Sequence, residues 1–383
     1  MNRYTTTSRN SYGSRVGWAL KWLIFWPILI LIAIGLLWWN EWRAVQRTQD
    51  LNTTQQSLVT LDTPIYNSEN DGKLIHTRGE LTGWEVRDSL FSLALDGILL
   101  ERVVEMYQWE ETRREERRDN LWGSETVTVT YDYNKVWSER PINSSNFNQA
   151  GTYINPSMPK RSQDFLSSDI RLWDFQLSDS LKNTLTATTE LSPSEENMIE
   201  WYNLKWEYLY KWEDINNPQI GDIRVSFRYL PSPTEISILA AQSSGVLLDD
   251  YKAKNSSVSR IMYGNHSSET MFDVLRSENT LLTWALRWLW FILLLAGFSA
   301  FFSIIPILAA VVPIFKALLG FWVGLISFVL ALIVWLTVII IAWIFVRPVI
   351  AIIAIIVIAW LVYMLIQRKK SMKPLAEEVQ SVS

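Results

Sequence analysis

The chain has 383 residues and a formal net charge of −4, and 49% of its residues are hydrophobic. It contains no Cys and only two His, which excludes Cys nucleophiles, haem-thiolate centres and ordinary zinc centres. The motifs of zinc proteases, serine hydrolases and P-loop nucleotide-binding proteins do not occur. We therefore expect no catalytic residues, no metal site and no cofactor.

Long apolar stretches occupy both ends of the chain. Four stretches of 19, 28, 30 and 20 residues carry no charged side chain, namely 22–40, 288–315, 317–346 and 348–367. About 20 apolar residues are needed to cross a hydrocarbon core about 30 Å thick. The sequence therefore predicts four transmembrane helices, one N-terminal and three C-terminal, at 22–40, 281–308, 318–346 and 348–367, with a short cytoplasmic-side segment at 309–317.

Tryptophans flank these stretches, as they do where helices pass through the membrane interface. The predicted interfacial anchors are Trp22, Trp38, Trp39 and Trp288. No small-residue cleavage pattern follows the first stretch, so we expect an uncleaved anchor rather than a signal peptide. Ionisable residues are rare in the spans, and Arg287 and Arg347 at span edges are expected to extend their charged groups to the membrane surface.

Basic residues in the short flanks predict the orientation of the chain. The tail 1–21 has basic but no acidic residues, the tail 368–383 begins with a basic cluster, and Lys316 separates the second and third spans. Such basic flanks usually stay in the cytoplasm. Both termini are therefore predicted to be cytoplasmic, and the segment 41–280 to be periplasmic or lumenal.

The large segment between the first two spans is acidic. Residues 42–280 contain 24 Lys+Arg and 36 Asp+Glu, a difference of −12. A nucleic-acid partner requires a net basic face that displaces counterions from phosphates. We therefore expect no nucleic-acid binding.

This acidic segment shows mainly strand patterns after a helical stalk at 41–63. Alternating apolar and polar residues at 102–112 and 126–137 predict an antiparallel hairpin of unusual length, and 220–229 and 235–242 predict a second pair of strands. Ser178 is expected to cap a short helix. The fold class is therefore an α+β membrane protein with four transmembrane helices and a large, mostly β extracytoplasmic domain. The similar strand starts GKLIHTRG and GDIRVSFR leave open whether this domain contains two related subdomains.

Two features are candidate interaction sites. The charged loop of the long hairpin, EETRREERRDNLWGSE, is typical of a solvated strand end that discourages edge-to-edge pairing. Exposed Arg and Trp also anchor interfaces, so the alternative is a partner or oligomer surface made of Arg113, Arg114, Arg117, Arg118 and Trp122. In the third span, Gly320 and Gly324 form a G-x-x-x-G motif that allows close helix packing.

Several stretches together resemble the LUMA family, also called the transmembrane protein 43 family. They are WWNEWRA from Trp38, GKLIHTRGEL from Gly72, VEMYQWEET from Val104, YDYNKVWSERPINSSNF from Tyr131, NPSMP from Asn155, GDIRVSFRY from Gly221, and WALRWLWF before the second span. The resemblance implies a multispanning protein with a large lumenal domain, roles in organising nuclear-envelope or ER membranes, self-association, contact with envelope proteins, and a channel-like or channel-modulating role. It implies no enzymatic activity. The Trp-rich, Cys-free composition suggests a bacterial relative in an inner membrane; a eukaryotic member would lie in the ER or inner nuclear membrane.

The function expected from the sequence is that of a non-enzymatic membrane scaffold. Its partners would be the lipid bilayer, further copies of the chain, and other membrane or envelope proteins. A channel or channel-modulating component is the first alternative, because three predicted spans cluster at the C-terminus. An extracytoplasmic ligand-binding or enzymatic domain is the second.

Overall fold

A computed structural model shows that the chain has two compact units. It describes residues 2–192, 203–205, 208–211 and 217–346, together with six single positions between 353 and 364. The β unit comprises Met1–Arg9, Gln49–Arg118 and Glu125–Ser277, and the helical unit comprises Asn10–Thr48, Asp119–Ser124 and Glu278–Ser383. The predicted fourth span at 348–367 and the tail 368–383 lie outside the continuous described ranges.

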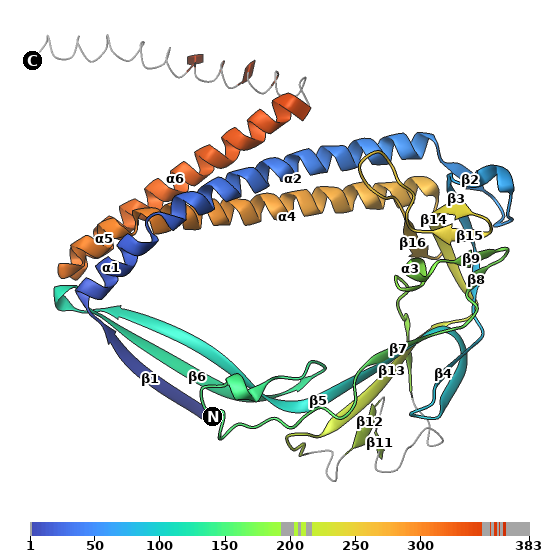
Figure 1. Cartoon of the computed structure of the whole chain (residues 1–383), viewed down its shortest axis with the longest axis horizontal. Coiled ribbons are helices and arrows are strands. Elements are labelled where there is room, and N and C mark those ends of the chain that lie inside the picture. Colours follow the sequence, from blue (N-terminus) through green and yellow to red (C-terminus); the bar gives the residue numbers. More distant parts are fainter. Residues whose placement is uncertain are drawn as a thin grey trace, which may run out of the picture. The chain divides into compact units, whose positions relative to one another are not determined.

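The β unit contains two sheets (Figure 1). The first follows the order β1-β6-β5-β13-β12-β11, with β4 and β7 also paired to β5 and β10 paired to β13. Its strands are β1 (Asn2–Asn10), β4 (Glu85–Asp88), β5 (Leu93–Asp119), β6 (Glu125–Ser138), β7 (Gln163–Leu166), β10 (Thr189–Leu191), β11 (Asn203–Lys205), β12 (Tyr208–Lys211) and β13 (Ile223–Pro231). The long hairpin predicted from the sequence is confirmed as β5 and β6.

The second sheet follows the order β16-β14-β15-β9-β8-β3-β2, and β14 also pairs with β3. Its strands are β2 (Val59–Leu61), β3 (Leu74–Thr82), β8 (Arg171–Leu172), β9 (Phe175–Leu177), β14 (Thr234–Ser243), β15 (Val246–Leu248) and β16 (Arg260–Tyr263). The short helix α3 (Asp179–Lys182) follows β9, and the Ser178 hydroxyl accepts a hydrogen bond from the Leu181 amide at 3.4 Å, as its predicted cap. The 3₁₀ turns Ser68–Asn70 and Ser144–Asn146 complete the unit.

Alternation along the strands builds the cores of the two sheets. In β13, Ile223, Val225 and Phe227 are buried on one face, as a period of two requires. They pack with Val104 and Met106 of β5 in the core of the first sheet. A separate core lies at the second sheet and contains Ile75, Leu81, Phe175, Leu230, Ile236 and Ile238.

The helical unit contains the apolar stretches. The helices are α1 (Tyr12–Trp22), α2 (Phe25–Gln56), α4 (Ser268–Phe302), α5 (Ile304–Leu308) and α6 (Pro313–Val346), of which α2 from Gln49 and α4 up to Ser277 belong to the β unit. A 3₁₀ turn at Ala309–Val311 joins α5 to α6, and a second at Leu121–Gly123 joins β5 to β6. Three described segments are long and apolar enough to cross a membrane: Phe25–Gln56, Ser268–Val311 and Ile314–Ile344. The chain is thus an integral membrane protein that combines these helices with a large β domain.

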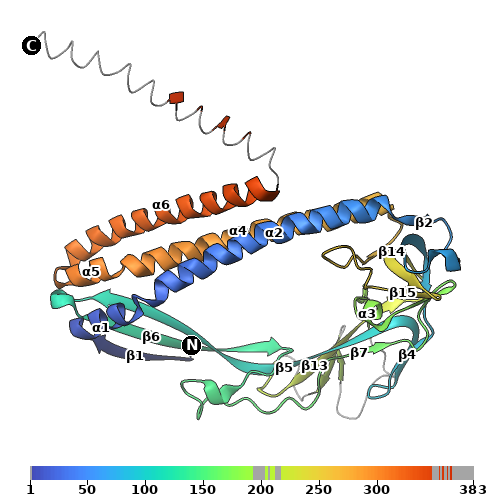
Figure 2. The ribbon, with the colours of Figure 1, turned by 45° about the horizontal axis from the view of Figure 1, so that its top comes forward.

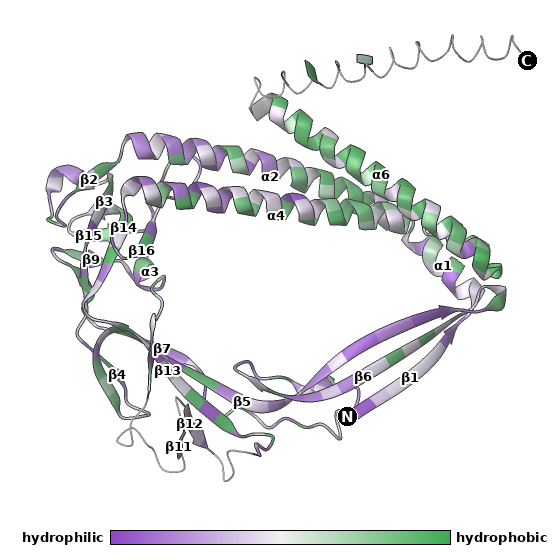
Figure 3. Cartoon of the chain, turned by 180° about the vertical axis from the view of Figure 1, so that it is seen from behind, coloured by the Kyte–Doolittle hydropathy of each residue, from purple (hydrophilic) through white to green (hydrophobic). Residues whose placement is uncertain are grey.

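Two described segments adjoin the first predicted span. The basic segment 1–21 contains β1 and most of α1. The predicted stalk is helical as far as Gln56, because α2 continues from the apolar stretch without a break. Hydrophobic colour covers α6, whereas α2 and α4 become hydrophilic toward the ends that join the β unit (Figure 3).

A buried ion pair inside the β unit offers a first test of this architecture. The Arg102 guanidinium donates to Asp88 at 2.6 Å, with side-chain exposures of 6% and 1%, and it lies over the rings of Phe91 and Phe165. We expect Asp88→Asn to lower the free energy of unfolding by about 3 kcal/mol, because it leaves a buried cation without its counter-charge. Denaturant unfolding of the full chain in micelles, followed by circular dichroism, measures this change.

The matched control is Glu85→Gln, which breaks the exposed pair between Glu85 and Arg87. Exposed pairs contribute little because water screens them. Equal losses from both substitutions would contradict the assigned role of the buried pair.

His76 makes the stability of the β unit depend on pH. Its side chain is buried in β3, and its Nε2–H donates to the His266 carbonyl at 3.1 Å. Burial, aided by the charge of Arg78, lowers the pKa of His76 against the opposing effect of that hydrogen bond. The unfolded chain therefore binds a proton near pH 6.5 before the folded chain does.

We expect the free energy of unfolding to decrease as the pH falls from 7.5 to 5.5. Above pH 7.5, His76 is neutral in both the folded and the unfolded chain, so it makes no further contribution to the pH dependence. Denaturant unfolding at several pH values measures the slope, which is at most about 1.4 kcal/mol per pH unit for one proton. His76→Gln removes the titrating group and should flatten the profile between these pH values. An unchanged slope in the variant would show that other groups cause it.

Candidate functional site

Two opposite charges meet in the interior of the helical unit. Glu41 projects from α2 and Arg287 from α4, and their side chains are 3% and 8% exposed. The guanidinium donates from Nε to Oε1 at 2.6 Å and from Nη2 to Oε2 at 2.7 Å. This bidentate geometry uses the planar fork of Arg, which Lys lacks.

Tryptophan side chains of α4 and α6 surround this ion pair. The Trp343 indole of α6 donates to Glu41 Oε2 at 3.1 Å. The Arg287 guanidinium lies 4.6 Å from the ring centroid of Trp284 and 5.7 Å from that of Trp343. Trp335, also on α6, donates to the Arg287 carbonyl at 3.0 Å. One ion pair therefore ties α2, α4 and α6 together.

Polar side chains continue from this pair along the contact between α2 and α4. Asn40 donates to the Thr283 carbonyl at 3.2 Å, and Asn279 donates to the Ala44 carbonyl at 2.9 Å. Arg43 of α2 donates to the Asn279 side chain at 3.1 Å and to the Thr283 hydroxyl at 3.2 Å. These bonds form a polar ladder that ends at the ion pair.

The sequence prediction for Arg287 was wrong. It placed the guanidinium at a span edge, extended to the membrane surface, whereas the structure buries it against Glu41. The signal that could have found the site is the spacing of Asn279, Thr283 and Arg287. Residues four apart lie on one helical face, so these three form a polar stripe on a largely apolar helix.

The two glycines of the predicted motif, Gly320 and Gly324, have open space around them within the described chain. No part of the described chain outside α6 lies within 4 Å of a Cβ built on Gly320 or Gly324, so neither makes a close helix contact here. Close packing occurs instead at Gly297 of α4, where a Cβ would lie 2.7 Å from Ile30 Cγ1 of α2. A single glycine, without the G-x-x-x-G spacing, permits this approach.

The predicted interfacial anchors remain largely on the surface. Trp38, Trp39 and Trp288 are 39%, 48% and 55% exposed. Trp22 is half-buried and packs edge-on against Phe25, with ring centroids 5.0 Å apart. These positions suit side chains in the membrane interface.

The predicted partner surface is divided between the two units. In the β unit, Arg113, Arg114 and Arg117 have side-chain exposures of 56%, 74% and 62%, and Arg118 is also exposed. Glu115 binds Arg113 and Arg117 at 2.6 Å each. In the helical unit, Trp122 is 80% exposed. The four arginines are therefore accessible, and at least two of them are partly neutralised by local carboxylates.

These features define an integral membrane protein whose apolar helices are held by a buried ion pair and carry a large β domain. The chain belongs to the transmembrane protein 43 family, whose model matches residues 106–348. It is 30% identical over 273 residues to transmembrane protein 43 of Pongo abelii, covering 67% of each chain. The Homo sapiens protein is 29% identical over 272 residues, again covering 67% of each chain.

The similarity extends further in an insect relative. The transmembrane protein 43 homolog of Drosophila melanogaster is 26% identical over 344 residues, covering 85% of this chain and 90% of its own. No solved structure matches the chain. The family expected from the sequence is thus confirmed, while the bacterial origin stays a prediction.

Removing one partner of the ion pair between Glu41 and Arg287 tests how much the pair stabilises the folded protein. We expect Glu41→Gln to destabilise the helical unit by about 3 kcal/mol or more, because Arg287 then remains buried without a counter-charge. Thermal unfolding in micelles, followed by tryptophan fluorescence, measures the loss. Asp273→Asn on α4 is the matched control, because the Asp273 side chain is 68% exposed in its pair with Arg276.

Replacing both residues of the ion pair distinguishes the effect of an unpaired buried charge from the effect of lost packing. Glu41→Leu with Arg287→Met should cost less than Glu41→Gln alone, because a well-packed apolar pair can replace a buried ion pair without stranding a charge. If the double variant were the less stable protein, the pair would contribute a net attraction beyond charge compensation.

Proposed function

We propose that this protein is a non-enzymatic membrane scaffold that self-associates through its helices and its β domain. The observation that carries this proposal is the open glycine face of α6. Gly320 and Gly324 meet nothing else in the described chain, and Phe321, Leu325 and Phe328 beside them are 66%, 44% and 45% exposed. Small residues on an apolar helix allow a second helix to approach closely in a membrane.

The charged hairpin supports a second contact, this time in water. Exposed Arg can bind carboxylates bidentately, and an exposed Trp supplies apolar area. The acidic balance of residues 42–280 offers carboxylates on any further copy of the chain. Association through Arg113, Arg114, Arg117 and Arg118 would therefore be weakened by salt, whereas association through α6 would not.

The experiment is the mass of the full chain in lipid nanodiscs. We expect one defined oligomer for the unmodified protein and a smaller species for Gly320→Ile with Gly324→Ile, because the added side chains keep helices apart. Gly35→Ile is the matched control, since Gly35 on α2 also has open space around it and lacks the motif. A monomer for the unmodified protein would overturn the proposal.

The contribution of the hairpin to association is measured in the same way, from the mass of the full chain in lipid nanodiscs. Replacing the four arginines by Ser or Gly should weaken association tenfold or more if they anchor the interface. Arg87→Ser removes an exposed arginine elsewhere on the β unit and serves as control. Unchanged assembly would remove the hairpin from the interface and leave α6 as its basis.

A further inference from the structure

Three exposed apolar side chains form a patch on the second sheet, which we call the turn patch. Trp173 lies in the two-residue turn between β8 and β9 and is 57% exposed. Ile65 and Tyr66, in the segment between β2 and β3, are 56% and 37% exposed. The Tyr66 ring meets the buried ring of Phe175 edge-on, with centroids 6.5 Å apart. Exposed Trp and Tyr rings are the side chains that most often anchor a protein interface.

The two segments of the turn patch are held side by side. A Cβ built on Gly79 of β3 would lie 3.1 Å from Pro64 and 3.2 Å from the indole nitrogen of Trp173, so both segments lie over the same point of β3. The Tyr66 amide donates to Asp174 Oδ2 at 3.3 Å, which links the segment 62–66 to the turn. The patch is therefore one surface and not two separate loops.

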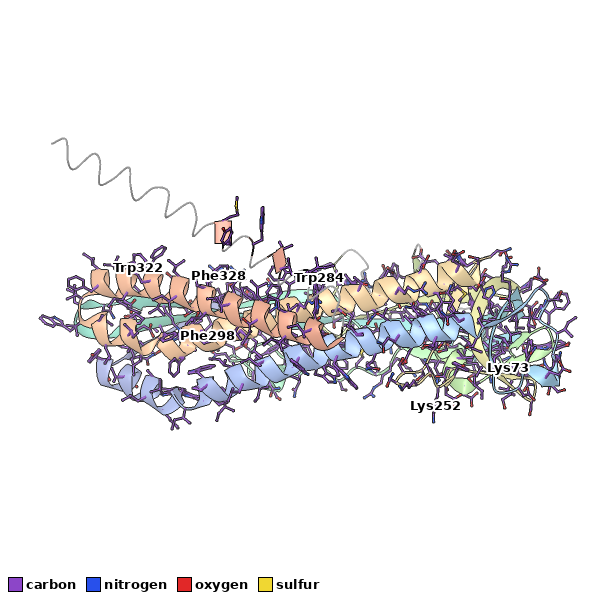
Figure 4. All side chains as sticks on the ribbon, turned by 90° about the horizontal axis from the view of Figure 1, so that it is seen from above. Lys73, Lys252, Trp284, Phe298, Trp322 and Phe328 are labelled. Carbon is purple, nitrogen blue, oxygen red and sulfur yellow. The ribbon has the colours of Figure 1, made fainter. Side chains whose placement is uncertain are left out.

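Carboxylates surround these rings. The ranges 62–72 and 173–177 contain no basic residue and four acidic ones, all exposed, namely Asp62, Glu69, Asp71 and Asp174. Lys73, labelled in Figure 4, is the next basic residue and precedes β3. Gln242 and the Tyr66 hydroxyl donate to Asp71 at 2.9 Å each. These bonds, that from Gln242 foremost, lower the pKa of Asp71 against the opposing effect of burial, so it is ionised at neutral pH.

Exposed rings beside carboxylates bind cations, and a guanidinium fits them best. It lies flat on an aromatic face while its N–H groups bind a carboxylate in a planar fork. The first sheet contains this arrangement in its own interior contacts. The Arg224 guanidinium lies 4.7 Å from the ring centroid of Trp137 and 4.9 Å from that of Tyr208, and its Nε donates to Glu105 at 2.6 Å. The turn patch offers the same two kinds of group on the surface.

The β unit also carries the complementary groups. Residues 113–118 read RREERR, with a net charge of +2, and all four arginines are exposed. Their guanidinium groups are the ligands that the turn patch fits by shape and by charge. The question is whether they can reach the patch of their own chain.

The course of β5 places the arginines far from the patch. Pro231 at the end of β13 lies opposite Gly97 of β5, and Thr234 at the start of β14 lies opposite Leu81 of β3, so the two sheets join near these residues. The turn patch lies beside β3, close to this junction. Arg113 follows Gly97 by 16 residues, which is about 50 Å of strand. Figure 2 shows the hairpin of β5 and β6 extending away from the second sheet.

We propose that the turn patch receives the arginine hairpin of a second copy of this chain. Guanidinium groups from 113–118 of one copy lie over the rings of Trp173 and Tyr66 of the next and bind the carboxylates around them. This inference rests on the self-association proposed above and names the surface that the hairpin binds.

The separation of the two surfaces determines the kind of assembly. Hairpin and patch are different surfaces at a distance from each other, so their contact is heterologous: each copy gives its hairpin to one neighbour and its patch to another. Such a contact repeats until it closes a ring or continues as a row. The β units therefore associate head to tail, in particles of three or more copies.

Light scattering of the full chain in detergent micelles tests the proposal by counting the copies in a particle. Every protein carries Gly320→Ile with Gly324→Ile, which removes the proposed α6 contact, and this protein is the parent. The patch variant adds Trp173→Gly with Asp174→Asn. Gly adopts the positive φ of 54° found at Trp173, and Asn keeps an oxygen for the Tyr66 amide, so the turn is retained. The hairpin variant instead replaces the four arginines by Ser.

We expect the parent to form particles of three or more copies at low ionic strength and to dissociate as salt is added. The patch variant and the hairpin variant should each associate at least tenfold more weakly, with the midpoint of thermal unfolding unchanged. An equimolar mixture of the two variants should form dimers and nothing larger. The hairpin of the patch variant can bind the patch of the hairpin variant, and no second intact pair of surfaces is then left.

The matched control is Trp84→Ser with Glu85→Gln in the parent. Trp84 is 70% exposed and also precedes an acidic residue, but Glu85 already binds Arg87 at 2.6 Å. This control should associate like the parent.

Three results would overturn the proposal. They are a patch variant that assembles like the parent, which would leave the patch to a different cationic partner; a parent that stops at dimers; and a mixture of variants that stays monomeric. Loss of assembly in the hairpin variant alone would keep the hairpin in the scaffold interface but remove the turn patch from it. Failure of the scaffold itself appears separately, as a monomer of the unmodified chain in nanodiscs.

Discussion

The pair formed by Glu41 and Arg287 is the constraint around which the helical unit is arranged. Two charges removed from water are tolerable only when each is compensated and its remaining hydrogen-bonding groups are satisfied. Here the carboxylate accepts from Arg287 and from Trp343, so α2, α4 and α6 must meet at one level. Apolar packing alone would allow these helices to slide, because one Leu contact can replace another. A bidentate ion pair has one geometry.

The β unit also contains a buried ion pair. Arg102 and Asp88 join β5 to β4 inside the first sheet, with the rings of Phe91 and Phe165 beside the guanidinium. Farther along β5 the charges become exposed and are balanced by neighbours such as Glu115. The long strand can thus be buried at one end and hydrated at the other. This change of surroundings lets one strand belong to a buried sheet at one end and to a charged loop at the other.

Much of the architecture could be predicted from local patterns. The apolar stretches, the hairpin at 102–137 and the buried face of β13 follow from periodicity and length, which depend on neighbouring residues only. The cap at Ser178 is local in the same sense. Gly297 and the polar ladder could not be found this way. Their roles depend on which helix lies opposite, and Gly320 with Gly324 has the expected spacing but no partner within the described chain.

The sequence by itself determined that the chain is a membrane protein with long apolar helices and a large acidic β domain, because hydrophobicity and alternation are properties of consecutive residues. Only the tertiary structure decided that Glu41 finds Arg287, 246 positions away, and that β1 joins the sheet of β6. Such pairings produce no periodic pattern in the sequence. Glu41 or Arg287 alone looks like any charged residue beside an apolar segment, and β1 alone looks like any short polar segment. They become visible only when the folded chain brings both partners together.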